Sequence, residues 1–215
     1  MAIILSYSLL RTIYTQNINE FNFCLQSRCV SFFKSKITGV IELAEFFGWL
    51  ITLITAVGGA IIALRAYVSG VENSNITNHI AHFTLFKDFV NSEIMKKKKI
   101  HPDTVDVHFW YNTIFPNSKK GDLNYNAEYS NKIYNIKRVI DEANHHIECL
   151  TEKYKYKTHQ RKMIDAVSEI GIGLSNGPKN IFTDIEPEVF ALIDSVNTTF
   201  IQTDVLLCLI NRKYI

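Results

Sequence analysis

Histidines are the residues of this chain with the clearest capacity for chemistry. His79 and His82 lie three positions apart, so their side chains share one face if the segment is helical. With His101, His108 and Cys149 they would supply the nitrogen and sulfur ligands that zinc prefers. However, the chain contains no HExxH, no paired CxxC and no acid–His–nucleophile spacing. We therefore expect structural or surface histidines and no metal, cofactor or catalytic centre, and a membrane-bound metalloenzyme using His79 and His82 is the weakest alternative.

A glycine-rich stretch, residues 171–177, has the composition of a phosphate-binding loop. The dinucleotide-binding fingerprint requires a strand before the glycines and a helix after them. Here the preceding residues 163–170 have a helical pattern, and Pro178 follows directly. The pattern favours the end of a helix followed by a turn.

Two basic runs are candidate contacts for an anionic partner. The first is residues 96–99, and the second alternates cations with Tyr154 and Tyr156. Cations interleaved with aromatic rings suit phosphate contact and base stacking, although a solvated helix end has the same composition. Near a cytoplasmic membrane surface either run could instead contact anionic lipid, worth ~1 kcal/mol per residue. The candidate protein or nucleic-acid contacts in the second run are Lys153, Lys155, Lys157, Arg161 and Lys162.

Charge and cysteine content narrow the class of protein. Residues 69–215 carry equal numbers of basic and acidic side chains, which argues against a nucleic-acid binder that uses its whole surface. The four cysteines form no recognisable disulfide framework or zinc spacing, so we expect free, buried thiols in a reducing compartment. They are Cys24, Cys29, Cys149 and Cys208.

Residues 46–64 form an apolar run without a single charge, and this run is the clearest indication of a structural element in the chain. About 20 apolar residues match the ~30 Å hydrocarbon core of a bilayer, whereas a buried core helix is expected to have ~10–14. Lys36 lies upstream and Arg65 closes the run, and Trp49 lies near one end, at the depth of interfacial aromatic rings. The run predicts a membrane span, with a buried core helix as the alternative.

The rest of residues 1–68 is assigned to the membrane region. Residues 1–14 are a candidate short first span. The alternatives are an interfacial anchor or a start codon assigned too far upstream. Small residues in a membrane helix let neighbouring backbones approach closely. Gly48, Gly58 and Gly59 are therefore candidates for self-association of the span, although glycine is common in such helices.

Residues 69–215 predict a helical soluble domain. Apolar residues at three- and four-residue steps suggest that the membrane helix continues through about residue 95. Further helices are expected over 102–116, 129–150, 158–174, 187–199 and 202–212. The helix over 129–150 carries a heptad stripe, which predicts packing against a partner helix. No strand pattern is evident. The predicted fold class is all-α: an N-terminal transmembrane helix followed by a helical bundle.

A longer pattern runs from the membrane helix into the bundle. Over roughly residues 45–150 it resembles the effector membrane proteins that are encoded beside bacterial retrons. The resemblance rests on Asn78-His79-Ile-Ala-His82-Phe83-Thr-Leu-Phe86, Val90-Asn91-Ser-Glu93-Ile94 and Trp110-Tyr111-Asn112-Thr-Ile114-Phe115-Pro116-Asn-Ser118, followed by Gly121.

That resemblance implies an antiphage toxin of the bacterial inner membrane, with two membrane helices and a cytoplasmic helical domain. A reverse transcriptase and its RNA-linked DNA (msDNA) would hold it in check. Phage interference would release it to damage the membrane and arrest growth. A membrane-tethered, non-toxic adaptor or sensor that binds a protein or nucleic acid is the alternative.

The topology is the one departure from that pattern, because a single full span is visible. For one span, Arg28, Lys34 and Lys36 would favour a cytoplasmic N-terminus and an exported bundle. If residues 1–14 also cross, both ends of the chain return to the cytoplasm. We expect the second arrangement, with the bundle in the cytoplasm.

Overall fold

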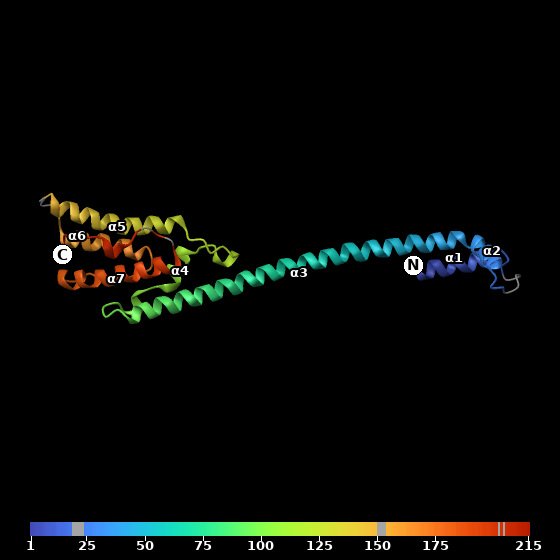
Figure 1. Ribbon diagram of the computed structural model, residues 1–215, viewed down its shortest axis with the longest axis horizontal. Coiled ribbons are helices and arrows are strands. Elements are labelled where there is room, and N and C mark those ends of the chain that lie inside the picture. The colour runs from blue at the N-terminus through green and yellow to red at the C-terminus, as the bar shows by residue number, and fades with distance from the viewer. Residues whose placement is uncertain (19–23, 150–153, 202, 204) are drawn as a thin grey trace. The chain divides into compact units, whose positions relative to one another are not determined.

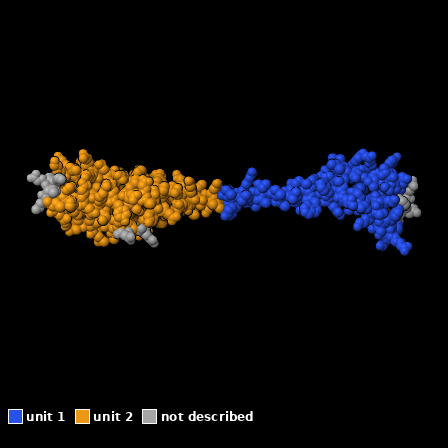
Figure 2. Space-filling model, turned by 90° about the horizontal axis from the view of Figure 1, so that it is seen from above, with its two compact units in different colours: residues 1–70 blue, residues 71–215 orange. Residues whose placement is uncertain are grey.

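The computed structural model describes residues 1–18, 24–149, 154–201, 203 and 205–215. Over these residues the fold is helical, with seven α-helices and no strand, so the predicted all-α class is confirmed (Figure 1). The chain divides into two compact units, Met1–Gly70 and Val71–Ile215 (Figure 2).

The first unit contains α1 (Ala2–Thr15), α2 (Ser27–Lys36) and the beginning of α3 (Thr38–Met95). α3 is a single uninterrupted helix, as the absence of proline after the apolar run suggests. It passes from the first unit into the second, where its last turns join the bundle.

The second unit adds four helices to the end of α3. Short 3₁₀ turns, η2 (Pro102–Thr104), η3 (Ser118–Lys120) and η4 (Leu207–Leu209), lie between or after them. The helices are α4 (Val107–Ile114), α5 (Ala127–Glu148), α6 (Tyr156–Ser168) and α7 (Lys179–Phe200).

Capping residues explain where two of these helices begin. The Asp106 carboxylate accepts a hydrogen bond from the Phe109 amide at 2.8 Å, and the Asn126 side chain accepts one from the Glu128 amide at 3.1 Å. Each bond satisfies one of the first backbone donors, which have no partner within the helix. The predicted helix over 102–116 is too long, because α4 begins only at Val107, after the separate η2 turn.

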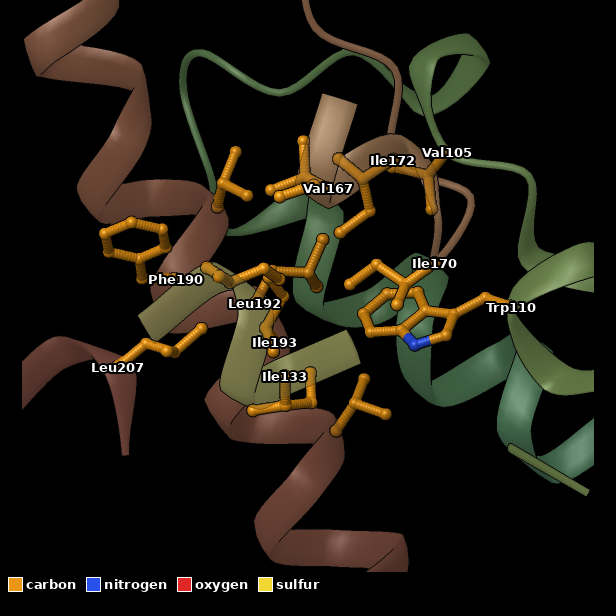
Figure 3. Packing of buried hydrophobic residues seen from close by; sticks show 14 of the residues in the cluster. Val105, Trp110, Ile133, Val167, Ile170, Ile172, Phe190, Leu192, Ile193 and Leu207 are labelled. Carbon is orange, nitrogen blue, oxygen red and sulfur yellow. The ribbon is translucent and has the colours of Figure 1, made fainter. Parts of the chain in front are cut away.

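One hydrophobic core fills the second unit. Apolar side chains of α3, α4, α5, α6 and α7 contribute to it, and Trp110 lies beside Ile170 in Figure 3. The predicted heptad stripe lies on the buried face of α5, where its members Tyr129, Ile133, Ile136, Ile140 and Ala143 are buried. Its last residue, Leu150, lies outside the described residues.

The glycine-rich stretch is a turn after a helix, as predicted. α6 ends at Ser168, and Gly171 adopts a φ of +90°. A Cβ atom at Gly171 would lie 2.9 Å from the Asp106 carbonyl oxygen, so the close approach requires glycine. The Gly171 carbonyl accepts from the Asp106 amide at 2.8 Å, which fastens this turn to the start of α4.

Three predicted helix bounds near the C-terminus are wrong. α6 stops at Ser168 rather than continuing to 174. α7 begins at Lys179, so Pro187 lies inside the helix rather than at its start. Pro187 lacks a backbone N–H, yet the helix continues through this position, and Phe182 and Glu186 are buried on the turns before it. The described part of 202–212 contains only the η4 turn.

The prediction for the cysteines also needs correction. Cys24 and Cys29 form a disulfide, with their Cα atoms 5.8 Å apart. The pair lies at the start of α2, a helix that was not among the predicted ones. Cys149 and Cys208 are free but exposed rather than buried. The short separation of the first pair allowed a local bridge that no sequence framework indicated.

Candidate functional site

The predicted span is apolar and unburied. Among the described helices, α3 is the one that is long and apolar enough to cross a membrane, and none of the residues in its most apolar stretch is buried. Trp49 is 76% exposed and Ile62 is 69% exposed. Such a surface is costly in water and stable in lipid, because lipid tails solvate apolar side chains.

The three glycines of the span have open surroundings. A Cβ atom added at Gly48, Gly58 or Gly59 would meet no described atom within 4 Å. The backbone there is therefore accessible to a neighbouring helix, and self-association through these glycines stays a prediction.

Beyond the span, two histidines of α3 make hydrogen bonds to the bundle. His79 Nδ1 lies 2.9 Å from Ser118 Oγ, and His82 Nδ1 lies 3.0 Å from the Tyr111 hydroxyl. Ser118 donates its own proton to the Phe115 carbonyl at 2.9 Å. Its oxygen must therefore accept from His79, which places the proton of that imidazole on Nδ1. We call His79, His82, Tyr111 and Ser118 the α3–α4 contact.

Aromatic rings pack around this contact. The His82 ring meets the Phe115 ring edge to face at 4.9 Å between centroids, and Phe83 meets Tyr111 at 5.1 Å. Phe200, from the end of α7, lies 5.9 Å from His82. Such pairs contribute ~0.5–1.5 kcal/mol each beyond simple burial. The contact therefore joins three helices that are distant in sequence.

A buried chain of hydrogen bonds orients Trp110 behind the contact. The Trp110 indole N–H donates to the Tyr129 hydroxyl at 3.3 Å, and Tyr129 donates to the Asn197 side-chain oxygen at 2.7 Å. All three side chains are buried. Burial raises the pKa of Tyr129 far above its ordinary value, so its hydroxyl remains a donor. The chain ties α4 to α5 and α7.

The turn after α4 fits closely against α3. Gly121 has a φ of +85°, and a Cβ atom there would lie 2.5 Å from Asn75 Oδ1. The Asn75 side-chain amide donates to the Lys120 carbonyl at 3.3 Å. This turn therefore extends the α3–α4 contact by one helical turn towards the membrane span.

Both histidines of the contact are held neutral. Burial lowers the pKa of His79, and the nearby Lys119 and His108 lower it further. Burial, with a smaller effect of His79, lowers the pKa of His82. A charged imidazole would lose hydration at this site without gaining an anionic partner, so the neutral forms are favoured.

Comparison with known proteins identifies the family. The sequence model of the Retron Ec48 antiviral membrane protein family matches residues 34–204. The chain belongs to this family. A relative from Escherichia coli, the Retron Ec48 transmembrane protein, is 41% identical over 210 residues, which cover 97% of this chain and 89% of that protein. No solved structure matches the chain.

The match confirms the resemblance and extends it at both ends, because the expected region was about 45–150. It makes this chain a retron-associated antiviral membrane protein. Of the residues that carried the resemblance, His79, His82 and Tyr111 meet in the α3–α4 contact, together with the surrounding rings. Asn78 and Pro116 are exposed.

The second basic run of this family member is only partly available for a partner. Lys153 lies outside the described residues, and Lys162 forms an ion pair with Glu142. Lys157 and Arg161 are exposed one turn apart on α6. Lys155 is exposed at the N-cap position of the same helix.

The first basic run is divided among structural contacts. Lys96 forms an ion pair with Glu93, and Lys99 Nζ lies 2.7 Å from the Asp184 carboxylate. These bonds fasten the end of α3 and the loop after it. The run is therefore a weaker candidate for an anionic partner than α6.

Sequence reasoning missed a buried carboxylate in the bundle. Glu186 accepts hydrogen bonds from Arg212 at 3.0 Å and from the Tyr214 hydroxyl at 2.9 Å, and His159 Nε2 lies 3.3 Å from it. The carboxylate is 1% exposed, and this arrangement holds the C-terminal segment against α6 and α7. No local pattern indicates this arrangement, since the partners of Glu186 are 26 to 28 positions away in the sequence.

Proposed function

We propose that this chain is the toxic effector of a retron antiphage system. The retron reverse transcriptase and its msDNA would restrain it, and phage infection would release it to damage the bacterial inner membrane and arrest growth. Family membership supports the antiviral and membrane context. The observation that carries the proposal is that one helix, α3, bears both the exposed apolar span and the α3–α4 contact.

The continuity of α3 offers a route for control. A partner bound to the bundle would act on the helix that also carries the span, since α3 runs from Thr38 to Met95. Release would free the span to self-associate through Gly58 and Gly59. The physical work is then done by helix packing and lipid rearrangement rather than by bond chemistry.

We further propose that α1 crosses the membrane and that the bundle is cytoplasmic. α1 has 14 residues, or about 21 Å of helix, against a hydrocarbon core of about 30 Å. A span this short requires local thinning of the bilayer, which itself favours disruption. Disulfides persist outside the cytoplasm, so the Cys24–Cys29 bridge between the two spans supports this arrangement. We give this disulfide more weight than the positive charges of Arg28, Lys34 and Lys36, which would favour a cytoplasmic location for the same segment.

Thiol labelling in intact cells tests the topology. A membrane-impermeant maleimide should label Cys24 and Cys29 after an impermeant reductant has been added. Cys149 and Cys208, which are free and exposed, serve as internal controls and should react only after permeabilisation. Labelling of these two in intact cells would place the bundle outside and refute the cytoplasmic assignment.

Inducible expression tests the toxic function. Expression of the chain alone should admit an impermeant dye, collapse the membrane potential and stop growth, and co-expression of the retron reverse transcriptase with msDNA should restore growth. Gly58→Leu/Gly59→Leu should lose toxicity at equal membrane levels, because bulky side chains block close helix approach. A matched change at Val57 and Ile61 to leucine should not. Normal growth with verified membrane insertion of the unaltered chain would overturn the proposal.

A non-toxic adaptor remains the second candidate, favoured by the exposed cations of α6. In that case the full chain should capture the reverse transcriptase or its msDNA while expression stays harmless. Charge reversal at Lys155, Lys157 and Arg161 should weaken capture, and reversal at Lys137, on a different helix, should not. Toxicity without capture would eliminate the adaptor.

A further inference from the structure

α2 has two chemically distinct faces that the bundle core does not use. Ser27, Ser31 and Ser35 follow one another at four-residue steps and share one face. Val30 and Phe33 lie on the opposite face and are 51% and 44% exposed. No residue of α2 is buried. This is an amphipathic helix whose apolar side exposes Val30 and Phe33.

The charges of α2 fit the boundary between these faces. At 100° per residue, Arg28 and Lys34 fall at the two edges that separate the serine face from the apolar face. Lys36 lies on the apolar side with its ammonium group 5.5 Å from the centre of the Phe32 ring. The helix carries no acidic residue. Long cationic side chains at such edges reach upward while their stems cover apolar surface.

The position of α2 in the chain brings it close to the bilayer. Residues 37–45 separate it from the uncharged run, and eight of them already belong to α3, which corresponds to a rise of about 12 Å. That distance is longer than the headgroup region, which extends ~5–8 Å beyond the hydrocarbon core on each side, so a tilt of α3 is needed to bring α2 to that region. At the other end, the Cys24–Cys29 disulfide joins the first turn of α2 to the segment before it.

We propose that α2 is an interfacial helix that binds the surface of anionic phospholipid. Val30 and Phe33 would lie at the boundary of headgroups and acyl chains, and Arg28, Lys34 and Lys36 would contact lipid phosphates. Helices of this composition lie in the membrane plane, ~5–10 Å into the interface. This inference does not depend on toxicity or on the retron partners. It assigns to α2 the role of a surface anchor beside the spans.

Tryptophan quenching in proteoliposomes tests the orientation. The full chain carries Trp49→Phe, which removes the exposed span tryptophan, and either Phe33→Trp or the matched control Ser31→Trp on the serine face. The vesicles contain phosphatidylcholine and phosphatidylglycerol with bromines at shallow or deep acyl positions. Shallow bromines should quench the Phe33→Trp protein more strongly than deep ones, and the Ser31→Trp protein should be quenched far less by either.

Two outcomes would overturn the orientation. Equal, weak quenching at both positions would place α2 away from the bilayer. Stronger quenching by deep bromines at both positions would make α2 part of a span. Neither result concerns toxicity, so failure here is distinguishable from failure of the proposed function.

The lipid class is tested by charge removal in the Phe33→Trp protein. Brominated phosphatidylglycerol should quench more than brominated phosphatidylcholine at equal mole fraction. Arg28→Gln/Lys34→Gln/Lys36→Gln should reduce this preference by up to about fivefold per charge, the equivalent of ~1 kcal/mol for each cation near the surface. An unchanged preference, or none in the unaltered helix, would refute recognition of anionic lipid.

Discussion

The Tyr111 hydroxyl should control how firmly α3 is held on the bundle. Tyr111→Phe removes one oxygen atom and leaves the ring, which packs 5.1 Å from Phe83 and 5.3 Å from Phe115. The lost hydrogen bond is the 3.0 Å contact with His82 Nδ1. The change therefore isolates the polar part of the α3–α4 contact from its packing.

The expected magnitude follows from the burial of the two partners. A buried polar group left without a partner costs ~1–3 kcal/mol. Tyr111 is fully buried, but His82 is half-buried and water can partly replace the lost bond. We therefore expect the lower end of that range, ~1–1.5 kcal/mol, which is about a fivefold to tenfold rise in the equilibrium constant for undocking.

Hydrogen–deuterium exchange of the full chain in lipid nanodiscs measures this constant. Amides of α3 between residues 79 and 94 should exchange about fivefold to tenfold faster in Tyr111→Phe. Tyr134→Phe, at a position that is 55% exposed, is the matched control and should leave exchange unchanged. His82→Phe retains a ring beside Phe115, so the double variant should cost less than the sum of the two single changes. Additivity within ~0.3–0.5 kcal/mol would refute a direct His82–Tyr111 interaction.

Two further predictions concern the same contact. Gly121→Ala should destabilise docking by ~1–2 kcal/mol and so speed exchange in the same segment, because φ is +85° and the new Cβ would meet Asn75. Gly177→Ala is the control, since its Cβ would meet nothing within 4 Å, and equal effects of the two changes would contradict the assigned clash. Lowering the pH should also weaken docking of α3 on the bundle. The pKa values of His79 and His82 are lowered in the docked state, so the undocked state binds protons first as the pH falls. The docking free energy that is present above about pH 6.5 is therefore lost as the pH falls through the lowered pKa values. If exchange, after correction for intrinsic rates, does not depend on pH, protonation of neither imidazole is coupled to docking.

Much of the fold could be predicted because its signals are local. The uncharged run of residues 46–64 exceeds what a water-soluble core requires, and solvation alone therefore indicates a membrane helix. The heptad stripe that begins at Tyr129 indicates a helix with one buried face, since its spacing matches the helical repeat. The absence of proline between Leu64 and Met95 permits the single helix that the structure contains.

The errors arose where distant partners override local preference. Pro187 lies inside α7, after turns that bury Phe182 and Glu186, and no local rule anticipates a helix through this proline. Residues 205–210 are apolar but form only the short η4 turn. There the Asp194 carboxylate accepts from the backbone amides of Leu207 and Cys208, at 2.9 and 2.8 Å. A side chain of α7 thus satisfies the backbone that a helix would otherwise satisfy.

The sequence by itself determined the class of the protein: a membrane helix, a helical bundle and the motif shared with retron antiviral membrane proteins. Hydrophobic periodicity and residue identity are properties of neighbouring positions, and they need no knowledge of the fold. Only the tertiary structure decided what the histidines do. Their partners, Tyr111 and Ser118, are 29 and 39 positions away, so the hydrogen bonds exist only once α4 has packed on α3. The same packing removes water from both imidazoles and lowers their pKa values.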